Sequence, residues 1–361
     1  KILVADAFRT LNDGSEAALV RFNADGSLDA SFGTDGTSLT DINVGGGDVW
    51  YDLLVLPDGK ILATGVTDQS RAKDLVVARF NSDGSIDTAF GIGGIYSTAT
   101  LSYGRGLALT SDGKYLVAGA GNSSDELIGV LRLNNDGTLD TSYGGGDGLA
   151  SSSVEGSGAT YSNPLTIQSD DKALVTGSAW GGSSDDVAVA RFTADGLPDS
   201  AFDGDGMAVN DFGGYQLGRE VRAQDDGKII VAGFGINTGT GHEEFITVRY
   251  NANGSLDAGY GNGGFAGYEY NGQDSRPYGM AFGDGHVYLA GYTQDDYSAI
   301  LDIAVPDVAA TCQADSFQSV VSLSDLNGNG SSEIAVAVPG STRVHIRDCL
   351  LYTSDAADEL T

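Results

Sequence analysis

A short loop late in the sequence carries the residues best suited to bind a metal ion. Asp325, Asn327, Asn329 and Glu333 alternate with other residues in the spacing D-x-N-x-N-G-x-x-E, with a glycine at the bend. Calcium takes about six to eight oxygen ligands, and alternate loop residues can direct their oxygens to one centre. Ser331 would add its backbone carbonyl. We therefore predict one Ca²⁺ site formed by Asp325, Asn327, Asn329, Ser331 and Glu333, with a plain Asn-Gly hairpin as the alternative.

A second oxygen-rich motif occurs five times, first as RFNADGSLDASFG from Arg21. Each copy begins with an arginine and has an acid eight residues later: Arg21 and Asp29, Arg79 and Asp87, Arg132 and Asp140, Arg191 and Asp199, Arg249 and Asp257. When its Asp-Gly turn is aligned with the late loop, Arg21 occupies the position of Asp325, the first carboxylate of that loop. The repeated motif is therefore a poor site for a metal cation. We predict a hairpin corner in which the acid accepts the internal arginine. The alternatives are a ring of arginines around a central channel for an anionic ligand, arginines simply exposed to solvent, and a partial calcium site.

An aromatic residue occupies one position in all five copies: Phe32, Phe90, Tyr143, Phe202 and Tyr260. Packing between neighbouring repeat units is the first explanation. A platform that stacks sugar rings is the competing one, and it requires exposed rings.

A second marker alternates with the first and defines the repeat. PDGKILATG, SDGKYLVAG, DDKALVTG, DDGKIIVAG and GDGHVYLAG follow the opening KILVAD, so five units cover the 285 residues between Lys1 and His286, 57 residues each. Each unit contains four short apolar segments separated by Asp-Gly or Asn-Gly turns, without helical periodicity. The prediction is an all-β protein, a β-propeller of five four-stranded repeats plus a shortened sixth unit, rather than an open β-solenoid.

The two markers resemble the delta-60 repeats, a propeller-forming family of large bacterial surface and secreted proteins, over residues 1–292. The resemblance implies no defined activity. Residues 293–348 resemble an FG-GAP repeat of integrin-like propellers, whose calcium loop has oxygen donors at the spacings seen here, and this unit would complete or extend the propeller. Residues 349–361 resemble a translated sequencing adapter and are predicted to be non-native, which leaves Cys312 as the one biological cysteine and makes the chain a fragment of a larger bacterial protein.

The charge excludes several classes of partner. The formal net charge is −31, from 50 Asp and Glu against 19 Lys and Arg, and such a field repels nucleic acid and anionic lipid. No apolar run approaches the ~18 residues that a membrane span needs. An acidic surface also suits a salty, calcium-containing medium, so we predict an extracellular or cell-surface location.

Enzyme signatures are sparse. His242, His286 and His345 are scattered, and we find no G-x-S-x-G, H-E-x-x-H or P-loop motif. Fifty acids produce carboxylate pairs by chance, so they indicate no glycosidase geometry. We predict a non-catalytic, calcium-binding scaffold or binding module, monomeric within a larger chain, with an unknown protein or glycan ligand. The alternative is a propeller-fold polysaccharide hydrolase or lyase.

Overall fold

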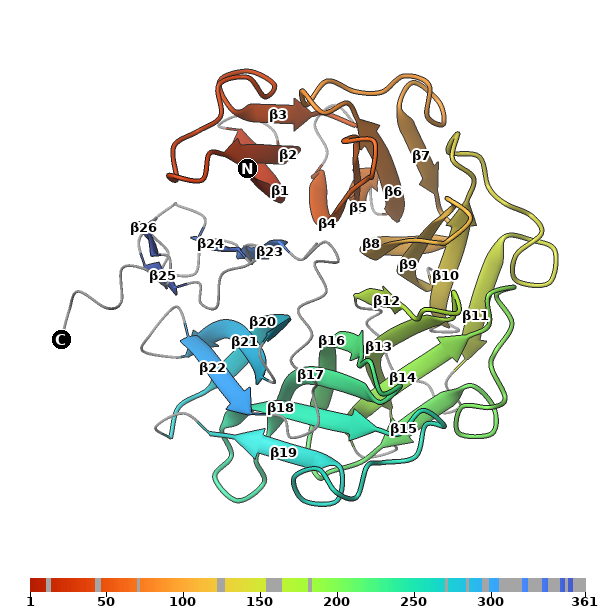
Figure 1. Cartoon of the computed structure of the whole chain (residues 1–361), viewed down its shortest axis with the longest axis vertical. Helices are drawn as coiled ribbons and strands as arrows, with labels where there is room; N and C mark the ends of the chain where they lie inside the picture. The colour runs from red at the N-terminus through yellow and green to blue at the C-terminus, as the bar shows by residue number, and fades with distance from the viewer. Residues whose placement is uncertain are drawn as a thin grey trace.

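The described part of the chain forms a ring of antiparallel β-sheets (Figure 1). The structure is a computed structural model, and it describes residues 1–10, 14–42, 47–69, 72–121, 127–153, 164–180, 184–269, 272–283, 286–293, 299–304, 320–323, 333–336, 345–347 and 350–352. In these ranges the regular elements are all strands, in four four-stranded, two three-stranded and two two-stranded sheets.

Six of these sheets are the blades of a propeller, numbered here in chain order. Blade 1 contains β1 (Ile2–Thr10), β2 (Gly14–Phe22) and β3 (Thr37–Thr40). Blade 2 contains β4 (Val49–Val55), β5 (Ile61–Gln69), β6 (Ala72–Phe80) and β7 (Ile95–Thr98). Blade 3 contains β8 (Leu101–Leu109), β9 (Tyr115–Gly121), β10 (Leu127–Leu133) and β11 (Leu149–Ser153).

The second half of the ring repeats this order. Blade 4 contains β12 (Leu165–Ile167), β13 (Ala173–Trp180), β14 (Asp185–Phe192) and β15 (Met207–Asn210). Blade 5 contains β16 (Gln216–Ala223), β17 (Ile229–Ile236), β18 (Glu243–Tyr250) and β19 (Phe265–Tyr268). Blade 6 contains β20 (Ser275–Gly283), β21 (His286–Thr293) and β22 (Ala299–Ala304).

The remaining strands are β23 (Val320–Leu323), β24 (Glu333–Val336), β25 (His345–Arg347) and β26 (Leu350–Tyr352), which pair two by two. β23 contacts β1, β4 and β20, so it lies between blade 1 and blade 6.

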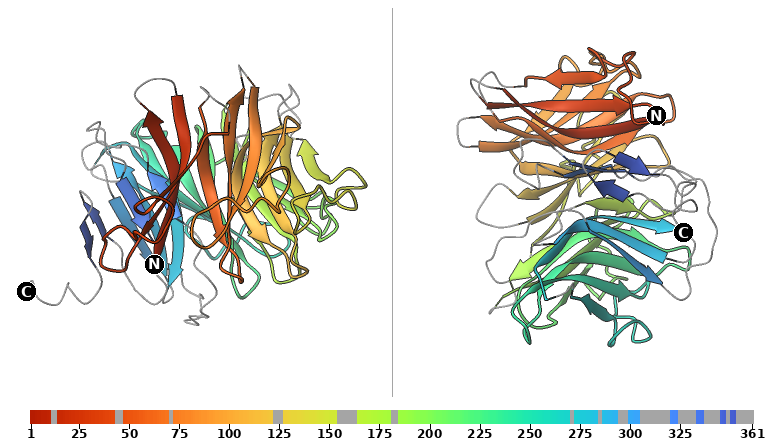
Figure 2. Two further views of the ribbon diagram at one scale, coloured as in Figure 1. Left: turned by 90° about the horizontal axis from the view of Figure 1, so that it is seen from above. Right: turned by 90° about the vertical axis from the view of Figure 1, so that its left-hand side faces the viewer.

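Strands within a blade follow one another from the axis of the ring outward. β4, β8, β12, β16 and β20 are innermost, and β7, β11, β15 and β19 lie at the rim (Figure 1). Seen from the side, the blades stand next to one another with their strands roughly along the ring axis (Figure 2). The innermost strands of five blades therefore surround the ring axis, and their residues can form one site there although they come from different blades.

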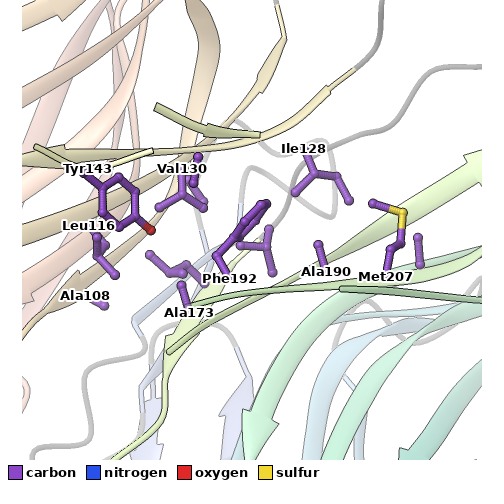
Figure 3. Close-up of a cluster of buried hydrophobic side chains, with 14 of the residues drawn as sticks. Ala108, Leu116, Ile128, Val130, Tyr143, Ala173, Ala190, Phe192 and Met207 are labelled. Carbon is purple, nitrogen blue, oxygen red and sulfur yellow. The ribbon is translucent and has the colours of Figure 1, made fainter. Parts of the chain in front are cut away.

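The core lies between blades because each blade is apolar on both faces. Strands such as β14, with the sequence DDVAVARF, are buried along nearly their whole length, as expected for a sheet covered on two sides. Between blades 3 and 4, Leu116 and Val130 pack with Ala173, Phe192 and Met207 (Figure 3). Such burial contributes about 1.5–3 kcal/mol for each large side chain.

The two sequence markers form two kinds of turn. The D-G-K marker connects the innermost strand to the second strand, and in blade 2 the Asp58 carboxylate accepts the Lys60 N–H at 3.0 Å. The R-F-N-x-D-G-S motif connects the third strand to the fourth in blades 2 to 5 and connects β2 to β3 in blade 1, where Asp25 accepts the N–H and the hydroxyl of Ser27. The predicted all-β propeller is thus confirmed, with blades 2 to 6 beginning one strand before the unit that the D-G-K marker delimits.

Candidate functional site

The predicted Arg–Asp contact occurs at all five corners. Each arginine Nε donates to the Oδ2 atom of the acid eight residues later, at 2.7 or 2.8 Å: Arg21 to Asp29, Arg79 to Asp87, Arg132 to Asp140, Arg191 to Asp199, Arg249 to Asp257. The contact uses the Nε atom of each guanidinium. Because these arginines are committed to internal partners, they do not form the alternative considered above, a ring of arginines for an anionic ligand.

Two further partners complete this contact, which we call the corner brace. In blade 2, Lys60 from the D-G-K turn lies 2.7 Å from the same Asp87 oxygen. The Lys60 ammonium, with Arg79, holds the pKa of Asp87 at about 2, below its ordinary 3.8. The arginine also reaches the next blade, as Arg132 does by donating from Nη1 to the Ala194 carbonyl at 2.8 Å. The brace therefore fixes both the corner of one blade and its neighbour.

The repeated aromatic residues pack between blades, as predicted. All five rings are at most 4% exposed, and each lies under the guanidinium of its own corner, 4.5–5.0 Å from ring centroid to Cζ. The ring of Phe32 in blade 1 contacts the turn of blade 2, where a Cβ atom on Gly84 would lie 2.9 Å away. Rings buried in this way offer no face to a sugar.

The axis of the ring differs from the corners. The innermost strands are irregular at one place, where the register shifts between Trp50 and Asp52, between Ser102 and Gly106, between Gly218 and Glu220, and between Pro277 and Gly279. The shift presses the bulged strand against the second strand. A Cβ atom on Gly65 would lie 1.8 Å from the Val49 carbonyl oxygen, and one on Gly233 would lie 1.9 Å from that of Leu217. This contact explains the glycine that ends the D-G-K marker.

Two carboxylic acids follow this bulge at one position of the repeat. Asp52 pairs with Thr64, and Glu220 pairs with Ala232, one residue before the marker glycine in each blade. The other blades with a described bulge have Gly106 and Gly279 there. Acids at this position are therefore a feature of two blades and not of the repeat.

The two carboxyl groups have different contacts. Asp52 is half-buried, and its oxygens accept the Leu53 N–H and, from the innermost strand of blade 3, the Leu107 N–H, both at 2.8 Å. Glu220 is 6% exposed, its Oε2 atom has no hydrogen bond, and it lies 3.6 Å from the Arg222 guanidinium. Backbone donors stabilise the ionised form of Asp52, whereas Glu220 depends on one cation.

Burial raises the pKa of both groups. The pKa of Asp52 rises from 3.8 to about 7, mainly because its carboxylate is removed from water and also because the charge of Glu220 acts on it. The pKa of Glu220 rises from 4.5 to about 7 through burial, against the opposing effect of Arg222. The field of one acid thus reaches the other across the ring axis. Near neutral pH each of these acids can hold or release a proton, which is the condition for acid–base chemistry.

Arginine and tyrosine side chains also lie on the innermost strands. Arg105 on β8 lies over the rings of Tyr51 and Tyr103. On the other side of the axis, Arg276 ion-pairs with Glu243 and lies over Phe234. None of these residues was predicted from the sequence, although a comparison of the repeat units at the position of Asp52 shows the departure from glycine.

The predicted calcium ligands do not contribute to this description. Asp325, Asn327, Asn329 and Ser331 lie outside the described residues, and Glu333 is described only as the first residue of β24. In the described ranges, no group of three or more His, Cys, Asp or Glu side chains is placed to hold a metal ion. His242 pairs with Asp274 at 3.3 Å, away from the other histidines in the sequence.

The fold and its repeats define a β-propeller repeat protein. Five segments, residues 1–32, 56–90, 110–143, 168–202 and 224–260, match the family model described as "Domain of unknown function (DUF5122) beta-propeller". These segments contain the D-G-K turns and the braced corners. No curated protein sequence matches the chain.

The solved structures that resemble this chain include two enzymes that act on arabinose-containing substrates, by their titles. An endo-arabinase from Bacteroides thetaiotaomicron has 12% identity and a TM-score of 0.37, with 71% of this chain and 94% of that chain covered. An α-L-arabinofuranosidase from Fusarium graminearum has 14% identity and a TM-score of 0.42, with coverages of 72% and 86%. A periplasmic gluconolactonase from Pseudomonas aeruginosa has 13% identity and a TM-score of 0.37, with coverages of 86% and 99%.

These matches correct the prediction of a non-catalytic module. The titles of the three structures name enzymes, so a non-catalytic module is not borne out. At these identities and TM-scores they give the fold and assign neither substrate nor catalytic residue to this chain. Among the described residues, no helix is long and apolar enough to cross a membrane.

Proposed function

We propose that this chain is a propeller-fold polysaccharide hydrolase whose acid and base are Glu220 and Asp52. One observation carries the proposal: the innermost strands of blades 2 and 5 place an acid at the same repeat position, and burial raises both pKa values to about 7. Hydrolysis of a glycosidic bond uses two carboxyl groups, one protonated and one ionised, at the pH of the reaction.

The contacts suggest the role of each acid. Glu220, buried and with one oxygen that accepts no hydrogen bond, would donate its proton to the glycosidic oxygen as the bond from that oxygen to the anomeric carbon breaks. Asp52, held by two backbone N–H groups, would remain ionised and take a proton from the water that attacks the anomeric carbon. The proton lost by Glu220 is thereby balanced by the one that Asp52 gains, and both return to their starting state through solvent.

The test is the release of reducing sugar from arabinan, xylan and polygalacturonate by the wild type and by the variants Asp52→Asn and Glu220→Gln. We expect kcat/KM to fall by about 10²–10⁴ in either variant. Asp58→Asn and Asp226→Asn are matched controls, since they remove an acid from an exposed turn of the same two blades and should keep the activity. Folded wild type that cleaves none of these polymers, or full activity in both test variants, would refute the proposal.

The setting of this activity is also a proposal. The delta-60 resemblance and the net charge of −31 support action on a glycan outside the cytoplasm, as a monomeric part of a larger protein. The spacing of Asp325, Asn327, Asn329 and Glu333, with the Ser331 carbonyl, supports a Ca²⁺ site of the FG-GAP type that stabilises the fold and takes no part in the reaction.

A further inference from the structure

We infer that Arg105, Tyr51 and Tyr103 form a subsite for a uronic acid, so that the polysaccharide bound at the axis is an anionic one. The inference rests on the proposed function for its place in a reaction but has an independent readout in binding. Its parts are a cation without an acidic partner, two half-buried rings, and a strained backbone that presents them.

Arg105 is unusual in this acidic chain because it forms no ion pair with any described residue. Its guanidinium lies 4.7 Å from the centroid of the Tyr51 ring and 5.4 Å from that of Tyr103. By contrast, each of the five corner arginines has a carboxylate at 2.7 or 2.8 Å. An arginine held by aromatic rings keeps its N–H donors available for a carboxylate that arrives with a ligand.

The two rings are suited to sugar stacking in a way that the corner aromatics are not. Tyr51 and Tyr103 are half-buried, with centroids 6.3 Å apart and planes inclined by 44°. A half-buried tyrosine has an apolar face for the C–H groups of a sugar and a hydroxyl for its polar edge. Together with Arg105, they match a six-membered ring that carries a carboxylate.

The backbone that presents these groups is strained. Between Ser102 and Gly106, β8 advances four residues while its partner β9 advances two, whereas the other described bulges add one residue. Tyr103 has a φ of +52°, a conformation unfavourable for a residue with a side chain. Such a cost, about 1–2 kcal/mol, is typical of functional sites and is not needed by the other blades.

The subsite adjoins the proposed acid pair. Tyr51 directly precedes Asp52, and Leu107, two residues after Arg105, donates its N–H to the Asp52 carboxylate. A uronate held here would thus lie beside the bond to be cleaved. The net charge of −31 repels a polyanion at long range. At about 0.15 M salt this repulsion is screened beyond about 8 Å. The local contact with Arg105 therefore determines whether an anionic sugar binds.

The experiment is a calorimetric titration of the full chain with tetragalacturonate and, separately, with neutral xylotetraose at 0.15 M salt. We expect the wild type to bind tetragalacturonate more tightly than xylotetraose. Arg105→Gln should weaken tetragalacturonate binding at least tenfold, Arg105→Lys should weaken it less, and neither should change xylotetraose binding more than twofold. Lys60→Gln removes the same charge in the turn between β4 and β5 and should leave both affinities unchanged.

The outcomes separate this inference from the proposed function. Tetragalacturonate binding that depends on Arg105 supports the subsite, whether or not any polymer is cleaved, whereas hydrolysis that depends on Asp52 and Glu220 tests the enzyme alone. Equal affinity for the two ligands, or affinities that Arg105→Gln leaves unchanged in a variant with wild-type thermal stability, would overturn the subsite.

Discussion

The outer corners of the blades and the innermost strands were built from the same repeat but differ in how closely the copies agree. At the corners, five arginines, five acids and five aromatic rings occupy equivalent positions and make equivalent contacts. On the innermost strands, the position of Asp52 is occupied by glycine in blades 3 and 6 and by glutamate in blade 5. The repeat units keep the same residues where these pack the blades together, and they differ at the position that holds the candidate catalytic acids.

The two regions also differ in the direction of their pKa shifts. Cations and hydrogen bonds keep the corner acids ionised, whereas burial favours the protonated form of the acids at the axis. A corner acid stabilises the folded state by its charge. An axial acid costs stability when it is charged, which is the usual sign of a group kept for function. The following predictions test this contrast.

Removal of one corner acid should produce the largest loss of stability. Asp87→Ala leaves Arg79, 6% exposed, without its carboxylate, so the free energy of unfolding should fall by about 3 kcal/mol. Chemical denaturation measures this loss. The matched control Asp83→Ala removes an exposed acid from the same turn and should cost about 1 kcal/mol or less. Equal losses in the two variants would show that the brace is not what stabilises the corner.

The acids at the axis should make stability fall with rising pH. The unfolded chain ionises Asp52 and Glu220 near pH 4, but the folded chain does so near pH 7, so stability is lost between these values and constant above them. Asp87 acts oppositely: its contribution is present above about pH 4 and lost as the pH falls toward 2. Melting curves from pH 2 to 9 should therefore show a smaller decline between pH 5 and 8 in Asp52→Asn and Glu220→Gln than in the wild type. An unchanged decline would remove the basis for assigning raised pKa values to these acids.

Calcium should stabilise the protein through the late loop and leave both regions above unaffected. For a dissociation constant of ~0.1–1 mM, 10 mM calcium adds roughly 1.4–2.7 kcal/mol. Thermal melting of residues 1–348 with calcium and with chelator measures this gain. The gain should disappear in Asp325→Ala. If that variant keeps the full calcium response, the ion binds elsewhere.

The smallest effect is expected where one corner departs from the others. Asp203 has a φ of +49°, at the position where the other corners have Gly33, Gly91, Gly144 and Gly261. Asp203→Gly relieves about 1–2 kcal/mol of backbone strain and costs about 0.5–1 kcal/mol in chain entropy, so stability should rise by about 0.5 kcal/mol. A loss of that size in denaturant titrations would mean that the Asp203 side chain contributes contacts of its own.

Much of the architecture could be predicted because the same two motifs recur in successive repeat units. The D-G-K and R-F-N-x-D-G-S motifs specify turns by local backbone chemistry, and the eight-residue spacing from Arg79 to Asp87 spans a single hairpin corner. The Lys60 contact was missed because Lys60 lies 27 residues from Asp87, on a different turn of the blade. The pair of Asp52 and Glu220 was missed for the same reason, because these two residues lie even farther apart in the sequence.

The sequence by itself determined the strands, the turns, the corner contacts and the ring of blades, since each depends on residues close along the chain and is repeated. Only the tertiary structure decided what lies at the axis. Asp52 and Glu220 are 168 residues apart and belong to different sheets, so their burial, their raised pKa values and the effect of the Glu220 charge on Asp52 exist only when the blades are arranged in a ring. Arg105 likewise acquires Tyr51 from another blade. Turns and corner contacts follow from residues within a single repeat unit, whereas a site shared by several blades depends on the position of each blade around the axis.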